Sequence, residues 1–224
     1  MLSRVKVDFE RVTESDLPQV RQMLASAPEL SHLDVDQVLA QWLREGYFIK
    51  AVDSDNRVVG VLHARVVDDA VWMEGIAVST DIRRKGVAKQ LAVYTMNLTG
   101  GRVFRVMAHE RNIPSNALAL ALGFKEIDRV YYCDGIKASA EELASKLSLR
   151  PDPQARPEGA GYVDSWVWRP MSSYKGRVFV GNGVVVLDTS PPFIVSGDAD
   201  GYERFCRQPR AEAETFIVYE LRRD

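Results

Sequence analysis

The stretch that most constrains this chain runs from Val71 to Thr99, VWMEGIAVSTDIRRKGVAKQLAVYTMNLT. Its first part, up to Val78, is mostly β-branched or apolar, which predicts a strand. A polar turn follows, then three basic residues and Gly86. From Val87 the apolar residues recur at helical spacing, and two consecutive glycines mark the end of the helix. The sequence therefore predicts a strand that leads through a basic, glycine-containing turn into a helix N-terminus.

Such a turn is suited to binding an anion. The first amides of a helix have no partner within it, and the helix dipole favours negative charge at that end. The basic residues Arg83, Arg84 and Lys85 add positive charge, and Gly86 lets a phosphate approach the backbone closely. Neither a Walker loop nor the three-glycine dinucleotide fingerprint is present. We interpret the turn as a pyrophosphate site, and the alternative is a surface turn with solvated basic side chains.

Composition limits the other classes of function. The chain has 224 residues, 46% of them apolar, which is ordinary for a water-soluble protein with a substantial core. A net charge of −2 argues against nucleic-acid and anionic-membrane binding, and no apolar run is long enough to span a bilayer. The N-terminus lacks a signal-peptide core, and Cys133 and Cys206 form neither a disulfide framework nor a zinc motif. We expect a cytoplasmic protein without a metal.

The order of predicted elements indicates an α/β fold with a mixed sheet flanked by helices. The first helix has Asp16 as its predicted N-cap and turns Val20, Leu24 and Ala27 inward, and the second ends at Gly46. In chain order the sequence predicts a strand at 5–12, helices at 16–27 and 35–45, strands at 47–52, 57–67 and 71–78, a helix at 87–99, a strand at 102–108, a helix at 116–122 and a strand at 124–132.

Two motifs within this order resemble those of a known family. Arg83-x-x-Gly86-x-Ala88 resembles the acetyl-CoA signature (Q/R-x-x-G-x-G/A) of the GNAT superfamily of N-acetyltransferases. Asn112 and the pair Gly123-Phe124, eleven residues further on, resemble the family's second motif. The resemblance covers about residues 5–135 and implies a GNAT-like fold with acetyl-CoA as the co-substrate.

The resemblance also implies which residues contact acetyl-CoA. The strand backbone would face the pantetheine arm as an added strand does, and Asn112 would contact the arm near the thioester. The residues implied are Ile76, Ala77 and Val78 for the arm, and Arg83, Arg84, Lys85, Gly86, Val87 and Ala88 for the pyrophosphate.

Glu74 is the candidate general base. It lies within an apolar strand, at the position where the family often places its catalytic glutamate. Burial beside apolar neighbours is expected to raise its pKa and its basicity. The alternatives are a carboxylate facing solvent or an ion pair with Arg65 on the neighbouring strand. Gly75 is predicted to mark a β-bulge that frees an amide for the oxyanion, and tight packing is the alternative there.

The acid that protonates the leaving thiolate is harder to assign. The family's usual tyrosine falls seven residues after the motif asparagine, and Ala119 stands at that position. Tyr131 or Tyr132 on the next strand, or water, would then supply the proton, and both tyrosines can equally be ordinary strand aromatics. His63 in the hairpin strand and His109 near Asn112 can line the acceptor cleft or simply pack, and His32 is expected in a loop.

The remaining residues have no family match. We predict residues 1–135 to be the acetyl-CoA-binding catalytic domain and 136–224 to be a small α+β extension. A helix is expected at 138–149, a linker at 151–161, and strands at 166–168, 177–187, 193–195 and 216–221. The last strand, within 215–222, either returns to the core sheet or belongs to an appendage, which we favour. The tryptophans and Tyr162 can form an acceptor pocket, a homodimer contact or core packing.

These observations predict an acetyl-CoA-dependent N-acetyltransferase that acts by direct attack of a primary amine. The acceptor is a small molecule or a protein amine, and the sequence does not separate them. The rival interpretation is a non-catalytic acyl-CoA-binding or sensing module, which Ala119 favours and Glu74 disfavours.

Overall fold

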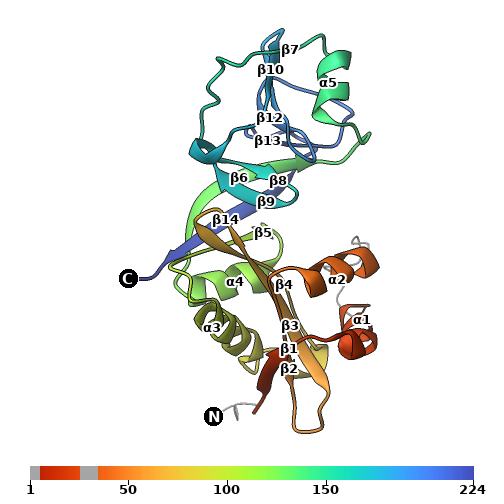
Figure 1. Cartoon of the computed structure of the whole chain (residues 1–224), viewed down its shortest axis with the longest axis vertical. Coiled ribbons are helices and arrows are strands. Elements are labelled where there is room, and N and C mark those ends of the chain that lie inside the picture. Colours follow the sequence, from red (N-terminus) through yellow and green to blue (C-terminus); the bar gives the residue numbers. More distant parts are fainter. Residues whose placement is uncertain (1–5, 26–34) are drawn as a thin grey trace. The chain divides into compact units, whose positions relative to one another are not determined.

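The computed structural model of the chain describes residues 6–25 and 35–224 (Figure 1). The chain divides into two compact units. The first unit comprises Met1–Val106, Ala117–Phe124 and Glu220–Asp224, and the second comprises Met107–Asn116 and Lys125–Tyr219.

The first unit is built on a mostly antiparallel sheet. Its first four strands pair in chain order. Polar turns join the second, third and fourth strands into hairpins, whereas helices lie between the first strand and the second. A parallel strand then pairs with the fourth, with Val71 opposite Phe104 and Trp72 opposite Arg105. The strands are β1 (Asp8–Arg11), β2 (Tyr47–Val52), β3 (Val58–Val67), β4 (Ala70–Val78) and β5 (Val103–His109), of which β5 continues into the second unit.

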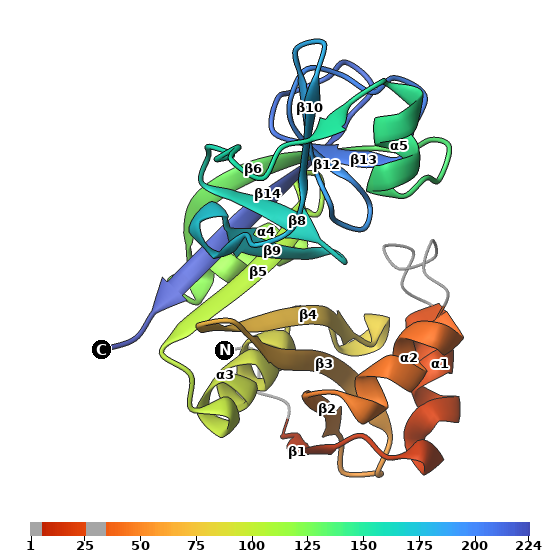
Figure 2. The ribbon, with the colours of Figure 1, turned by 45° about the horizontal axis from the view of Figure 1, so that its top comes forward.

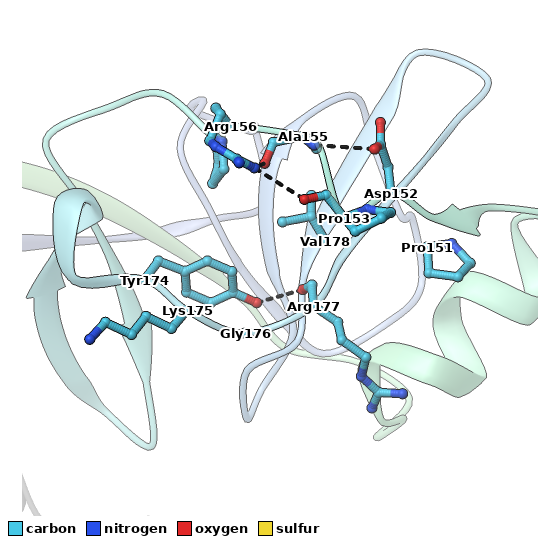
Figure 3. Close-up of a pocket in the computed structure, with 11 residues that line it drawn as sticks. Pro151, Asp152, Pro153, Ala155, Arg156, Tyr174, Lys175, Gly176, Arg177 and Val178 are labelled. Atoms are coloured by element: carbon cyan, nitrogen blue, oxygen red, sulfur yellow. Dashed lines mark hydrogen bonds between the residues drawn. The ribbon is translucent and has the colours of Figure 1, made fainter.

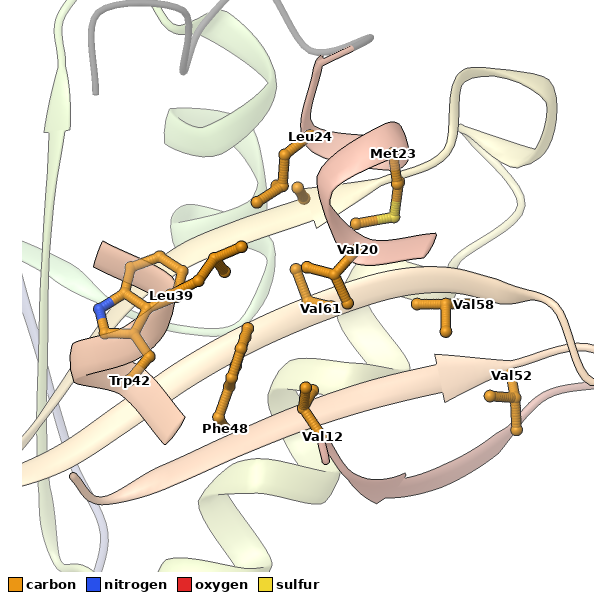
Figure 4. Packing of buried hydrophobic residues seen from close by; sticks show 11 residues of the cluster. Val12, Val20, Met23, Leu24, Leu39, Trp42, Phe48, Val52, Val58 and Val61 are labelled. Carbon is orange, nitrogen blue, oxygen red and sulfur yellow. The ribbon is translucent and has the colours of Figure 1, made fainter. Parts of the chain in front are cut away.

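Helices cover both faces of this sheet (Figure 2). Helices α1 (Leu17–Ala25) and α2 (Val35–Arg44) pack on one face, where Figure 4 shows their apolar side chains over β2 and β3. The opposite face carries α3 (Val87–Thr99), whose Leu91 is buried against Gly60. A short turn of helix, η1 (Glu14–Asp16), precedes α1, another, η3 (Thr80–Ile82), precedes α3, and α4 (Ile113–Ala121) has residues in both units.

The second unit is mainly antiparallel strands with one helix, α5 (Ala140–Lys146). Within it, β6 pairs with β13, β13 pairs in parallel with β12, and β12, β11, β10 and β7 follow as antiparallel neighbours, while β8 and β9 form a separate hairpin. The core lies between α5 and these strands. The elements are β6 (Lys125–Cys133), β7 (Arg150–Pro151), β8 (Gly161–Asp164), β9 (Val167–Pro170), η4 (Met171–Ser173), β10 (Val178–Gly181), β11 (Val184–Leu187), β12 (Phe193–Ser196), β13 (Arg204–Cys206) and β14 (Glu214–Arg222).

The predicted α/β class with a mixed sheet and flanking helices is confirmed. Of the two placements left open for the last strand, the structure shows the return to the core: β14 lies between β5 and β6 in the sheet order. Just after β14, the backbone N–H of Arg223 donates a hydrogen bond to the carbonyl oxygen of Arg102, just before β5. The boundary at residues 135/136 stays a prediction.

Several local predictions were wrong. Asp16 is not the N-cap of the first helix; its carboxylate instead accepts hydrogen bonds from the amide and hydroxyl of Thr13. The helix predicted at 116–122 begins at Ile113, and the helix predicted at 138–149 is shorter because Ser139 caps its start. The single strand predicted at 177–187 is the hairpin β10–β11, which turns at Asn182.

Ala27 and His32 lie outside the described residues. No helix in the described ranges is long and apolar enough to cross a membrane.

Candidate active site

The turn that leads into α3 has an unusual backbone. Arg84 and Gly86 both adopt positive φ, 64° and 82°, and Gly86 is the N-cap of α3. A Cβ at Gly86 would meet no heavy atom within 4 Å, so the space above this helix start is open. The Nε of Arg83 donates to the carbonyl of Val78 at 3.0 Å and holds the turn against the end of β4. The turn therefore presents the first amides of α3 on an accessible surface.

Two of the basic side chains in this turn, Arg84 and Lys85, keep their charge uncompensated within the part of the chain that the structure describes. Arg84 and Lys85 are exposed and form no ion pair with any residue that the structure describes. The neighbouring carboxylate, Asp81, is taken up by Arg57 at 2.9 Å. Hydrogen bonds from Ser79 and Arg57 lower the pKa of Asp81, so it stays ionised and paired. Two free cations beside a helix N-terminus make this turn a suitable site for a phosphate group.

The β-bulge predicted at Gly75 is present in β4. Val61 lies opposite Ala77 and His63 opposite Glu74, so Leu62 alone faces the two residues between them. Gly75 has φ of 64°, and a Cβ there would lie 1.9 Å from the ring of Trp42. Both the backbone conformation and the close approach of Trp42 therefore require glycine.

The end of β4 has an edge that β5 does not pair. In the part of the chain that the structure describes, the ladder between these strands comprises Val71 with Phe104 and Trp72 with Arg105. The other edge of β4 pairs with β3 as far as Val78. Within 76–78, the backbone groups that point away from β3 thus face the β5 side, where an extended ligand can pair with them as an added strand does.

Glu74 lies in this strand with its side chain 21% exposed. Its Oε1 is 2.9 Å from Nδ1 of His63 and 3.5 Å from Nε of Arg65, and its Oε2 accepts a hydrogen bond from Nε1 of Trp72 at 3.0 Å. The contact with Arg65 that we considered as an alternative is therefore present, and the carboxylate is not simply turned to solvent.

The expectation of a raised pKa at Glu74 was wrong. Desolvation by burial is the largest single influence on the pKa of Glu74 and raises it. The hydrogen bond from His63, the charges of Arg65 and His63 and the hydrogen bond from Trp72 together outweigh burial, and they lower that pKa below its ordinary value. Glu74 is thus ionised at neutral pH but is a weaker base than an isolated buried carboxylate.

The other candidates belong to the second unit. Asn112 caps the start of α4, where its Oδ1 accepts from the amide of Ser115 at 3.2 Å. The hydroxyl of Tyr132 donates to Glu203 at 2.8 Å, and burial together with this carboxylate raises the pKa of Tyr132. Tyr131 packs beside the core of this unit. The structure thus brings Glu74, the strand end and the basic turn together in the first unit, whereas Asn112, Tyr131 and Tyr132 belong to the second unit.

Sequence reasoning named His63 but missed its partner and its stacking neighbour. Trp42 lies parallel to His63, with ring centroids 5.1 Å apart and an interplanar angle of 9°. Strand periodicity could have predicted that Glu74 is the partner of His63. His63 and Arg65 are two residues apart on β3 and share one face, which is the face that Glu74 occupies on the adjacent strand. Trp42 is distant in sequence, so only the fold places it there.

A cavity of about 630 Å³ lies elsewhere, in the second unit (Figure 3). Tyr174 closes one side, where its hydroxyl donates to the carbonyl of Arg177. None of the predicted site residues lines this cavity. Its lining consists of Pro151, Asp152, Pro153, Ala155, Arg156, Pro157, Tyr174, Lys175, Gly176, Arg177 and Val178. Within the described residues no group of three or more histidine, cysteine or acidic side chains is arranged to hold a metal ion.

Part of the chain matches a known protein family. Residues 17–124 match the acetyltransferase (GNAT) family. The chain carries a GNAT acetyltransferase domain. The family match ends at Phe124 and does not cover the C-terminal extension. No curated protein sequence matches the chain.

Solved structures resemble the fold of this chain over more than the family match. A candidate acetyltransferase from Thermoplasma acidophilum is 18% identical with a TM-score of 0.67, over 96% of this chain and 100% of that one. The IAA acetyltransferase from Bacillus cereus is 15% identical, with a TM-score of 0.51, over 97% and 100%. The ribosomal-protein-S18-alanine N-acetyltransferase from Escherichia coli is 16% identical, with a TM-score of 0.50, over 61% and 87%. At these identities the likeness concerns the fold alone.

Proposed function

We propose that this GNAT protein transfers the acetyl group of acetyl-CoA to a primary amine. The observation that carries the proposal is the turn before α3: an open helix start beside two exposed cations, Arg84 and Lys85, that have no ion-pair partner among the described residues, directly after a strand end whose β5-side edge is unpaired. In this proposal Arg83, Arg84, Lys85, Gly86, Val87 and Ala88 bind the diphosphate, and Ile76, Ala77 and Val78 pair with the pantetheine arm. Asn112 would contact that arm near the thioester.

The proposed reaction is direct attack. The amine nitrogen bonds to the thioester carbonyl carbon, the carbon–sulfur bond breaks, and the thiolate leaves with a proton from an acid or from water. A lysine-like amine is neutral in only about one molecule in a thousand at pH 7, so a base is useful. Glu74 would take the proton lost by the amine, directly or through water, and a positioned base typically contributes about 10²–10⁴ in rate.

Tyr131 and Tyr132 remain the proposed sources of the proton for the thiolate. Tyr132 is the weaker of the two, because its hydroxyl is already bonded to Glu203 and its pKa is raised. Ala119 is buried in α4, with 5% of its surface exposed, so no proton donor replaces the family's tyrosine there.

The test is thiol release from acetyl-CoA in the presence of a panel of small amines, amino acids and peptides. We expect turnover with at least one class, and we expect Glu74→Gln to lower kcat by about 10²-fold or more while CoA affinity stays unchanged. Glu126→Gln is the matched control, because Glu126 is an exposed strand carboxylate paired with Arg129. Turnover at the wild-type rate in Glu74→Gln would remove Glu74 from the mechanism.

A non-catalytic acyl-CoA-binding or sensing module is the second candidate, favoured by Ala119. CoA binding without turnover of any acceptor in the panel would support it. In our proposal the acceptor is a small molecule, which the extension at 136–224 favours, or a protein amine. The proposal also includes a homodimer and a cytoplasmic location.

A further inference from the structure

A fully buried histidine faces the proposed base. His63 has no exposed surface and lies opposite Glu74 in the β3–β4 register. Both of its ring nitrogens have partners: Nδ1 is 2.9 Å from Oε1 of Glu74, and Nε2 is 2.8 Å from the carbonyl oxygen of Glu45. These two contacts restrict where the protons of the pair lie.

A carbonyl oxygen only accepts hydrogen bonds, so Nε2 of His63 must carry a hydrogen. If His63 were neutral and Glu74 ionised, the bare Nδ1 would face a carboxylate oxygen, and two lone pairs would meet with no hydrogen between them. One proton must therefore lie in this contact. The pair is either an imidazolium with a carboxylate or a neutral imidazole with a carboxylic acid.

The surroundings favour the ionised form. Trp72 donates to Oε2 of Glu74, and Arg65 lies between the carboxylates of Glu74, at 3.5 Å, and Glu45, at 3.3 Å. With His63 protonated, the two cations balance the two carboxylates. These are the charged groups that the described structure places against the pair.

Aromatic rings enclose the other sides of the imidazole. Trp42 stacks on it in parallel, and Phe48 meets it edge-on at 6.2 Å. A parallel tryptophan face stabilises a buried cation, so this packing also suits an imidazolium.

We propose that His63 is a positioning residue for acetyl transfer: it remains an imidazolium, and its Nδ1–H keeps Glu74 ionised and correctly oriented. This inference rests on the proposed role of Glu74. When the amine gives up its proton, the N–H bond breaks and a new O–H bond forms on a free lone pair of Glu74. His63 keeps both ring protons throughout, and Glu74 then releases its proton to solvent.

The protonation state is tested without any turnover. In the full chain labelled with ¹⁵N-histidine, we expect the His63 ring at pH 7 to show two protonated nitrogens in long-range ¹⁵N–¹H NMR spectra, assigned with His63→Gln. In Glu74→Gln the amide can donate to Nδ1, so we expect a neutral ring protonated on Nε2. A neutral His63 ring in the wild-type protein would overturn the inference, whether or not the enzyme activity is found.

The positioning role is tested by the pH dependence of kcat/KM. Without His63 the buried carboxylate keeps its desolvation but loses its main donor, so in His63→Leu we expect the acid limb to move up by about one pH unit or more. His63→Gln, which keeps a donor, should restore part of that shift. Lys50→Met is the matched control, because it removes a buried cation from β2 that pairs with Asp16 and not with Glu74.

An unshifted acid limb in a folded His63→Leu protein would overturn the positioning role. Should His63→Leu fail to fold, His63→Gln and the NMR comparison of the wild-type protein with Glu74→Gln decide the question. Should no amine be acetylated, the proposed function fails, and the spectra still report on the His63–Glu74 pair by themselves.

Discussion

Arg204 in the second unit and Arg84 in the first unit lie in opposite electrostatic surroundings. In the second unit Arg204 has only 1% of its surface exposed, and its guanidinium lies 3.1 Å from Asp198, 3.4 Å from Asp200 and 3.1 Å from Glu212. It also donates to the carbonyl of Tyr202. Its charge is compensated within the protein.

In the first unit, the turn before α3 has two positive charges, Arg84 and Lys85, that can interact with an external anion. Arg84 and Lys85 are exposed and have no ion-pair partner among the described residues, and Arg84 adopts the left-handed backbone conformation that non-glycine residues rarely take. A compensated arginine orders the chain around itself, whereas an uncompensated one remains free for an external anion. The comparison predicts that mutations in the two regions affect different measurements.

The largest effect is expected from Gly86→Glu. A carboxylate at the start of α3 would occupy the open space and repel the diphosphate, so we expect CoA affinity in calorimetry to fall by roughly a hundredfold or more, about 2.8 kcal/mol. The fold should persist, since a Cβ at Gly86 meets no atom within 4 Å.

Gly100→Glu provides the matched control for that variant. Gly100 ends the same helix with φ of 63° and equally open surroundings, so it carries the same backbone strain and the same added charge. We expect its CoA affinity to match the wild type. Unchanged affinity in Gly86→Glu would refute the diphosphate site.

Arg204→Met should instead lower stability. Removing it leaves three carboxylates around a buried gap, and we expect the free energy of unfolding to fall by about 3 kcal/mol, the low end for a broken buried ion pair because the carboxylates are partly exposed. Denaturant unfolding measures this. Arg129→Met, which breaks an exposed pair with Glu126, should cost under about 1 kcal/mol. Equal losses in both variants would show that the buried cluster contributes no more than a surface pair.

A smaller effect is expected when both free cations of the turn are removed. In the double variant Arg84→Ala/Lys85→Ala, CoA affinity at low salt should fall about tenfold, at roughly 0.5–1 kcal/mol for each charge. The loss should shrink as salt is added, because these charges are exposed. Lys125→Ala/Arg129→Ala removes two exposed cations from β6 and should leave affinity unchanged. A salt-independent loss would indicate a structural effect instead.

The smallest effect concerns a compensated pair in the first unit. Lys50 lies 2.7 Å from Asp16. Burial raises the pKa of Asp16, but the hydrogen bonds from Lys50 and Thr13 lower it by more, so the net effect is a lowered pKa. Because the pKa of Asp16 is lower in the folded state, its ionised carboxylate stabilises the fold at pH values above 3.8, the pKa of the unfolded state. This stabilisation is lost as the pH falls through the pKa of the folded state. Asp16→Asn should therefore cost about 1 kcal/mol at pH 7 and progressively less below pH 3.8.

Glu10→Gln is the comparison for that pair, because Glu10 also contacts Lys50, at 3.2 Å, but is 58% exposed. We expect a smaller loss of stability from it. A loss in Asp16→Asn that is the same at acidic and neutral pH would contradict the assigned origin.

Periodicity and turn residues predicted the first unit well. The hairpins around Asp53 and Asp68, the helix stop at Gly46 and the strand–turn–helix before Val87 follow from local patterns, and the structure contains each of them. The second unit was predicted less well. Its strands are short, and the prediction of one strand at 177–187 overlooked the turn Gly181-Asn182-Gly183, which separates two apolar runs and is typical of a hairpin.

The return of β14 to the core could not be decided from the sequence. The apolar run from Phe216 to Leu221 predicts a strand, but local periodicity does not say which strands it pairs with. Its neighbours are β5, which ends at His109, and β6, which ends at Cys133, whereas β14 begins only at Glu214, so long-range pairing decides its place.

The sequence by itself determined the strand, the basic turn with Gly86 and the helix, because local backbone preferences and hydrophobic periodicity fix each of them. It also placed Glu74 within an apolar strand. Only the tertiary structure decided the chemistry of Glu74, because its pKa depends on His63 and Arg65, which the β3–β4 pairing brings to its carboxylate. Trp72, two residues earlier on the same strand, adds a further donor. Residue type sets which groups can ionise, and the neighbours supplied by the fold set how strongly they do so.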